Sequence, residues 1–198
     1  MSDARSVTVE DELTIVFPGT WAMIPLNDPE RSARSIARLV SERVGRADRL
    51  ARVRRTAKAE LEKLVALAED SDAFALAMSM EILPGVPFPA SIVMAREALP
   101  AGDDAEARLE RAFPDGEPLA FSFGPVRRRS SVRQTTYEEE SAPELLADYR
   151  FEAPDGERII HLRVNAPMVT DPDLYLELFD AIVDSISFRA PLERPAAG

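Results

Sequence analysis

His161 is the residue in this sequence best suited to acid–base chemistry. It is the only histidine, and it lies in the run Arg158-Ile-Ile-His-Leu-Arg-Val164. The alternation predicts a strand in which Ile160, Leu162 and Val164 face the core and His161 faces the other side. A Ser-His-Asp triad would need this histidine as its base, and a lone histidine cannot form a two-histidine metal site. We interpret His161 as an ordinary sheet residue.

Motifs for covalent and phosphate chemistry are absent from the sequence. There is no Gly-x-Ser-x-Gly elbow, and the eight glycines form neither a P-loop nor a Gly-x-Gly-x-x-Gly loop. The chain has no cysteine, which excludes disulfides, thiolate nucleophiles and sulfur-based zinc sites. The run Glu138-Glu139-Glu140 is typical of a solvated strand end, and Asp171 and Asp173 fit helix capping. We therefore predict no catalytic residue, no cofactor and no metal.

Basic residues gather in one segment of an acidic chain. The net charge of −11 opposes general affinity for nucleic acid or anionic lipid. Between Arg31 and Lys58, ten basic residues face two acids, so this segment carries +8 and the rest of the chain −19. The candidate partner-binding residues here are Arg31, Arg34, Arg38, Arg52 and Arg55. Two interpretations stay open: a solvated face balanced by the chain's own acids, or a docking surface for an acidic protein partner.

Phe88 is a further candidate partner-binding residue. It lies in the proline-rich loop Pro84-Gly-Val-Pro-Phe-Pro89, and loops held by a rigid scaffold often carry binding. The first interpretation of this loop is a plain hairpin connector, and the alternative is a lip for partner contact with an exposed Phe88. Four further arginines would extend the basic patch if the fold brings them near it: Arg127, Arg128, Arg129 and Arg133.

Two stretches predict helices from their start signals and their apolar spacing. Asp28-Pro29 can cap and open a helix, and Thr170-Asp171-Pro172 repeats the signal for an amphipathic helix that extends to Ile186. After Asp28 the apolar residues at helical spacing are Ala33, Ile36, Ala37, Val40 and Val44, and then Leu50, Val53, Ala57, Leu61, Leu64 and Ala68. Residues 28–72 therefore form a helical hairpin or one long helix that tolerates Gly45.

The remaining pattern predicts strands. A Pro18-Gly19 turn predicts that Leu13–Phe17 and Trp21–Leu26 form a hairpin, with a buried Trp21 as anchor. Further strands are expected at Phe74–Ile82, Ser91–Leu99, Leu119–Phe123, Val126–Tyr137, Leu145–Phe151, Arg158–Val164 and Ser185–Arg189, with a short helix up to Phe113. Alternation places Met78 and Met80 in the core.

These elements predict an α+β fold. A mainly antiparallel sheet of five to seven strands is covered by an N-terminal helical hairpin and a C-terminal amphipathic helix. We expect a single domain over residues 7–190, with flexible tails at 1–6 and 191–198.

Two stretches resemble a known fold. Phe17-Pro-Gly-Thr-Trp-Ala-Met-Ile-Pro-Leu26 resembles the first hairpin of the Mog1/PsbP-like fold, and Leu178-Phe-Asp-Ala-Ile-Val-Asp-Ser-Ile-Ser-Phe188 resembles its closing helix and strand. The middle of the chain is similar to an uncharacterised actinobacterial family, through Val44-Gly45-Arg46, Arg54-Arg55 and Val86-Pro-Phe-Pro-Ala-Ser-Ile-Val93. The fold resemblance implies binding and adaptor roles and supplies no catalytic residues. The helical insertion at 28–72 departs from the simple PsbP-like layout.

The leading hypothesis is a non-enzymatic binding or adaptor protein that acts through a protein partner. The alternative is a small-molecule hydrolase or transferase whose site the sequence does not reveal. We expect a cytoplasmic protein, because the first residues lack an apolar leader and the best apolar run, Ala73–Leu83, is too short for a membrane span and contains Glu81. Nucleic acid and membrane are not expected as partners, and a homodimer is left open.

Overall fold

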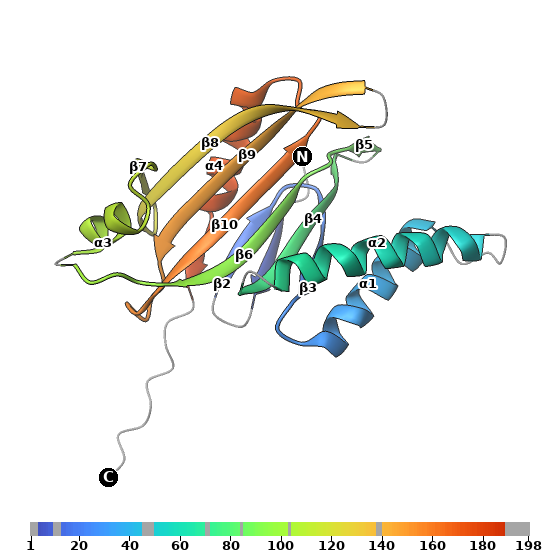
Figure 1. Cartoon of the computed structure of the whole chain (residues 1–198), viewed down its shortest axis with the longest axis horizontal. Helices are drawn as coiled ribbons and strands as arrows, with labels where there is room; N and C mark the ends of the chain where they lie inside the picture. The colour runs from blue at the N-terminus through green and yellow to red at the C-terminus, as the bar shows by residue number, and fades with distance from the viewer. Residues whose placement is uncertain are drawn as a thin grey trace, which may run out of the picture.

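The structure is a computed structural model that describes residues 4–9, 13–44, 50–69, 72–83, 85–102, 104–137 and 140–188 (Figure 1). The described residues combine helices with a mainly antiparallel sheet, which confirms the α+β class. The helices are α1 (Pro29–Val44), α2 (Ala51–Glu69), α3 (Ala105–Ala112) and α4 (Pro172–Asp184). Among residues 28–72, α1 and α2 are separate helices that contact each other, while residues 45–49 lie outside the described part.

The larger sheet has eight strands within the described residues, one more than the upper end of the expected range. Its order is β3-β4-β6-β10-β9-β8-β7, with β5 paired to β4, and each of its pairs is antiparallel. The strands are β3 (Thr20–Pro25), β4 (Ala73–Leu83), β5 (Val86–Pro87), β6 (Ser91–Ala98), β7 (Glu117–Phe121), β8 (Gly124–Tyr137), β9 (Glu140–Glu152) and β10 (Arg158–Pro167).

A smaller sheet pairs the two ends of the described chain, and it corrects the first predicted hairpin. It consists of β1 (Arg5–Val9), β2 (Leu13–Phe17) and β11 (Ser187–Phe188), in the order β1-β2-β11. The predicted pairing of Leu13–Phe17 with Trp21–Leu26 is wrong, because the Pro18-Gly19 turn carries the chain from the small sheet into the large one. A turn signal fixes where the chain bends but not which strand becomes its partner.

Gly19 explains why the chain can cross between the sheets at this point. Its φ is +74°, and a Cβ built on it would lie 2.1 Å from the backbone oxygen of Glu81 on β4. A side chain here would face both an unfavourable backbone conformation and a collision with backbone. The crossing therefore depends on glycine.

The main core fills the space between the large sheet, the small sheet and α4. Phe179 and Ile182 of α4 and Ile15 of β2 are buried with Tyr149 and Leu162 of the large sheet. In Figure 1, α4 lies behind the large sheet. Helix α4 begins as the sequence predicts, because an Asp171 side-chain oxygen accepts a hydrogen bond from the Leu174 amide at 3.2 Å.

A second core lies on the opposite face of the sheet, under the α1–α2 hairpin. Ile24 of β3 and Leu76 of β4 pack there with α1 and α2 residues. The buried residues of α1 are Ser32, Ile36, Leu39 and Val40. The predicted stripe is right for Ile36 and Val40 but wrong for Ala33 and Ala37, which are exposed. The larger Leu39 takes the buried position because its burial removes more apolar area from water than an alanine does.

The single domain over residues 7–190 stays a prediction. Strand β1 begins at Arg5, two residues before the expected boundary at 7. Residues 1–3 and 189–198, which hold most of the expected tails, lie outside the described residues. No helix of the described part is both long and apolar enough to span a bilayer.

Candidate functional site

The predicted arginines on α1 project into solvent. Arg34 lies 3.6 Å from Glu30 and Arg38 lies 4.0 Å from Glu42, each as a pair one helical turn apart. The two arginine side chains are 69% and 72% exposed, so each pair is screened by water and contributes about 0.3–0.5 kcal/mol. These contacts hold the guanidinium groups weakly, and both groups stay accessible to a partner.

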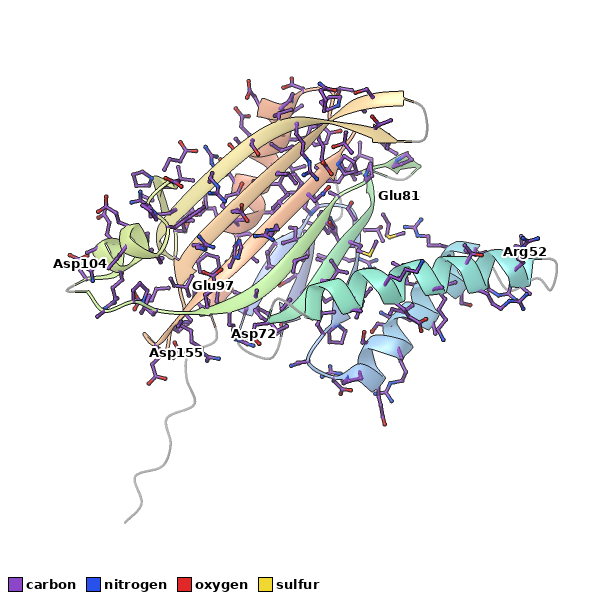
Figure 2. All side chains as sticks on the ribbon, viewed as in Figure 1. Arg52, Asp72, Glu81, Glu97, Asp104 and Asp155 are labelled. Carbon is purple, nitrogen blue, oxygen red and sulfur yellow. The ribbon has the colours of Figure 1, made fainter. Side chains whose placement is uncertain are left out.

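The other three predicted arginines are exposed and make no ion pair with any described carboxylate. Arg31 lies on a flank of α1 together with Ser35, one turn further along. Arg52 and Arg55 lie in the first turns of α2. Figure 2 shows Arg52 at the end of the hairpin furthest from the sheet. The five arginines therefore form a spread of accessible cations along the hairpin and no single cluster.

The arginines of β8 do not extend this basic surface, contrary to the sequence-based expectation. Arg128 pairs with Glu117 and Asp180, and Arg133 pairs with Glu144. Cross-strand register explains the pairing, because Arg133 lies directly opposite Glu144 on β9.

Arg127 and Arg129 are engaged as well. Arg127 is buried, and its Nε donates to the Phe113 carbonyl at 3.0 Å, beyond the end of α3. This contact satisfies a carbonyl at the helix C-terminus, where positive charge is favourable. Arg129 lies 3.4 Å from Asp148, the residue opposite it on β9. The basic charge of β8 is thus used inside the molecule.

His161 lies on the side of β10 that the alternation predicts, but it is buried between two carboxylates. Its Nδ1 lies 3.0 Å from Glu97 Oε1 on β6, and its Nε2 lies 2.7 Å from Asp148 Oδ1 on β9. Only 6% of the residue is exposed. Glu97 is labelled in Figure 2. Three neighbouring strands therefore contribute one member each to this Glu97–His161–Asp148 network.

The electrostatics of the network favour a closed ion cluster. Burial alone would raise the pKa of Asp148, but hydrogen bonds and charge from His161 and Arg163 outweigh it and hold this pKa well below its usual range. Glu97 also accepts from Arg150 Nη2 at 3.0 Å. With both nitrogens engaged, His161 has no free position from which to take a proton from a substrate.

The sequence analysis found His161 but not its partners. Glu97 and Asp148 lie 64 and 13 residues away in the chain, and nothing in their local pattern marks them. The available signal was the strand alternation, which places all three on one face once the strand order is known.

Phe88 is buried, so the predicted exposed lip is wrong. It is 4% exposed, and its ring lies 5.2 Å from Tyr175, 6.1 Å from Phe179 and 6.4 Å from Trp21. The proline-rich loop turns Phe88 inward, where its ring packs against the surrounding aromatic rings and is removed from solvent. Phe88 packs the end of β5 against α4. We therefore no longer consider it a partner-binding residue.

Trp21 is half-buried rather than fully buried. Its ring stacks on Phe17 at 4.7 Å, and its Nε1 donates to the Pro18 carbonyl at 3.0 Å. It is an anchor of the turn between the two sheets, with part of the ring reaching solvent.

The remaining predicted residues have structural surroundings. Met78 and Met80 are partly buried against the second core, as expected for packing. Glu138 and Glu139 lie outside the described residues. Within the described part, no group of three or more His, Asp or Glu side chains could hold a metal ion.

A cavity of about 570 Å³ opens between the two sheets beside α1. Its apolar lining comes from Val7, Val9, Met23, Pro25, Phe74 and Ala75, and its polar lining from Thr8, Asn27, Arg31 and Ser35. A second cavity of about 480 Å³ lies between α3 and the β7–β8 turn and is mainly apolar. Volumes of this size are typical of small-ligand sites. No local pattern signals the first cavity, because its walls come from residues 7–9, 23–35 and 74–75, whereas the second cavity is lined by residues within 106–127.

Comparison with known proteins identifies no relative: no family model, no curated protein and no solved structure matches this chain. The resemblance to the Mog1/PsbP-like fold and to an actinobacterial family therefore stays a prediction.

Proposed function

We propose that this protein is a non-enzymatic binding or adaptor protein that docks an acidic protein partner on the outer surface of the α1–α2 hairpin. The docking surface comprises Arg34, Arg38, Arg52 and Arg55, with Arg31 on its flank. A cytoplasmic location and a homodimer are secondary parts of the same proposal.

The observation that carries the proposal is a difference between the arginines of the large sheet and those of the hairpin in how they pair with carboxylates. The arginines of the large sheet lie against carboxylates of neighbouring strands, as in Arg133 with Glu144 and Arg150 with Glu97. On the hairpin, Arg52 and Arg55 have no such partner among the described residues, and Arg34 has only a 3.6 Å contact with an 86% exposed Glu30. Among the described residues, these sheet arginines are therefore neutralised by carboxylates of neighbouring strands, whereas Arg52 and Arg55 on the hairpin keep available positive charge.

This surface suits recognition by charge complementarity. Exposed arginines offer planar groups that bind carboxylates through two parallel hydrogen bonds. Within a Debye length of the hairpin, its positive charges attract an acidic segment although the net charge of the protein is −11. An acidic protein segment is therefore the partner chemistry that the hairpin favours.

The alternative of a hydrolase or transferase receives less support from the geometry. A general base must reach the proton that it removes, and His161 is enclosed by Glu97 and Asp148. None of the other described groups with a shifted pKa lies where it could transfer a proton to a substrate. Tyr149, for example, is buried beside Asp180, and both its burial and this carboxylate raise its pKa far above the usual range and keep it protonated.

Affinity capture from an extract of the cells that make the protein tests the proposal. The bait is the full chain, compared with Arg34→Glu/Arg38→Glu. A matched control, Arg5→Glu/Arg111→Glu, makes the same change in net charge at exposed positions off the hairpin. We expect an acidic protein to be retained by wild type and by the control but lost from the hairpin variant. Equal retention by all three baits would contradict the proposal.

A further inference from the structure

The cavity between the two sheets has the composition of a site for a small anion. Strands β1 and β3 contribute to its lining, and β4 adds the apolar Phe74 and Ala75. Helix α1 closes one side with Arg31 and Ser35. These walls come from segments far apart in the sequence, so the cavity exists only in the folded chain.

Arg31 supplies the positive charge at this cavity. It lines the cavity and makes no ion pair with a carboxylate in the described part of the chain. Its neighbours Arg34 and Arg38 have acids one turn away, at Glu30 and Glu42, and they do not line the cavity. Arg31 is exposed, and a guanidinium that makes no ion pair within the protein can bind the carboxylate of a ligand through charge-assisted hydrogen bonds.

The rest of the lining limits the ligand further. The hydroxyls of Thr8 and Ser35 can donate to or accept from a polar group, while Met23, Phe74 and Ala75 offer apolar contact. The volume of about 570 Å³ is within the range of small-molecule sites and too small for a folded partner.

We infer that this cavity binds a small organic carboxylate, with its charged end at Arg31 and a short apolar body against Met23 and Phe74. This site uses Arg31, on the flank of the proposed docking surface, but not Arg34, Arg38, Arg52 or Arg55, so either proposal can fail without the other. No covalent step is involved.

Methionine-methyl NMR on the full chain tests the site directly. The probes are pentanoate and benzoate, with pentanamide and benzamide as neutral molecules of the same shape. We expect the Met23 methyl signal to shift with a saturable dependence on carboxylate concentration. The signal of Met168, which is 51% exposed and outside the cavity, serves as the internal control and should not move. The amides should bind at least tenfold more weakly.

Substitutions test whether Arg31 supplies the positive charge that binds the carboxylate. Arg31→Gln should weaken carboxylate binding at least tenfold, while the matched Arg34→Gln should leave it unchanged. Ser35→Leu, at a half-buried position that lines the cavity, narrows this space and should weaken the binding of acids and amides alike. Absence of a Met23 shift with both carboxylates at 20 mM (about twentyfold above a usual upper KM near 1 mM) would overturn the inference. Equal binding by wild type and Arg31→Gln would also overturn it.

Discussion

Tyr149 Oη on β9 donates a hydrogen bond to Asp180 Oδ1 on α4 at 2.8 Å, and this contact ties the helix to the sheet beneath it. Arg128 pairs with the same carboxylate from β8. Tyr149 is fully buried while the Asp180 side chain is 26% exposed, so the hydrogen bond lies at the edge of the main core. One acidic side chain of α4 thus joins the helix to two strands of the large sheet.

Asp180→Ala is expected to destabilise the protein by about 2–4 kcal/mol, since it leaves both a buried hydroxyl and the Arg128 guanidinium without this partner. Tyr149→Phe should cost less, about 1 kcal/mol, because Asp180 keeps Arg128. Urea unfolding measures both. Glu177→Gln, an exposed position on the same helix, is the control and should match wild type. Equal stability of Asp180→Ala and the control would show that the contact does not hold α4.

His161→Gln should lower the free energy of unfolding by about 1–3 kcal/mol, because the uncharged amide places an oxygen against one of two carboxylates. This revises the sequence-based view of His161 as an ordinary sheet residue, for which the substitution should be neutral. Arg163→Gln is the control: Arg163 bonds the same Asp148 at 3.0 Å but its side chain is 59% exposed, so its loss should cost under about 1 kcal/mol. The two variants are compared by thermal and urea unfolding.

The lowered pKa of Asp148 predicts a pH dependence of stability. An unfolded aspartate titrates near 3.9, about the ordinary value, and the folded one titrates lower. The folded state therefore binds fewer protons, so Asp148 contributes stability above the unfolded pKa that is lost as the pH falls below about 4. Asp148→Asn should show a shallower decline of unfolding free energy between about pH 5 and pH 2. Parallel curves for variant and wild type would refute this role.

Gly19→Ala and Gly85→Ala form a matched pair. Both glycines have positive φ, +74° and +77°, but an added Cβ meets the Glu81 oxygen at 2.1 Å at Gly19 and nothing within 4 Å at Gly85. The backbone conformation alone costs about 1–2 kcal/mol in each. Gly19→Ala should therefore be destabilised by several kcal/mol more than Gly85→Ala in urea unfolding. Similar losses would mean that β2 and β3 are not joined by this close crossing.

Local pattern was enough to predict most elements, because helix spacing and strand alternation are properties of neighbouring residues. It predicted strands β4, β6, β8 and β10 and the Asp171 cap of α4. It failed where the answer depends on distant partners. Strand β2 joins β1 and β11 instead of β3, Phe88 turns inward to meet α4, and His161 acquires Glu97 and Asp148 from other strands.

The association rate between the purified protein and its captured partner tests the central claim most directly. Stopped-flow mixing at low and high salt compares wild type, Arg34→Glu/Arg38→Glu and the control Arg5→Glu/Arg111→Glu. If the hairpin docks an acidic partner, the hairpin variant should associate about tenfold more slowly at low salt, with the difference shrinking in 0.5 M salt (Debye length about 4 Å), and the control should match wild type. Equal association rates for the hairpin variant and the control at low salt would contradict docking on the α1–α2 hairpin.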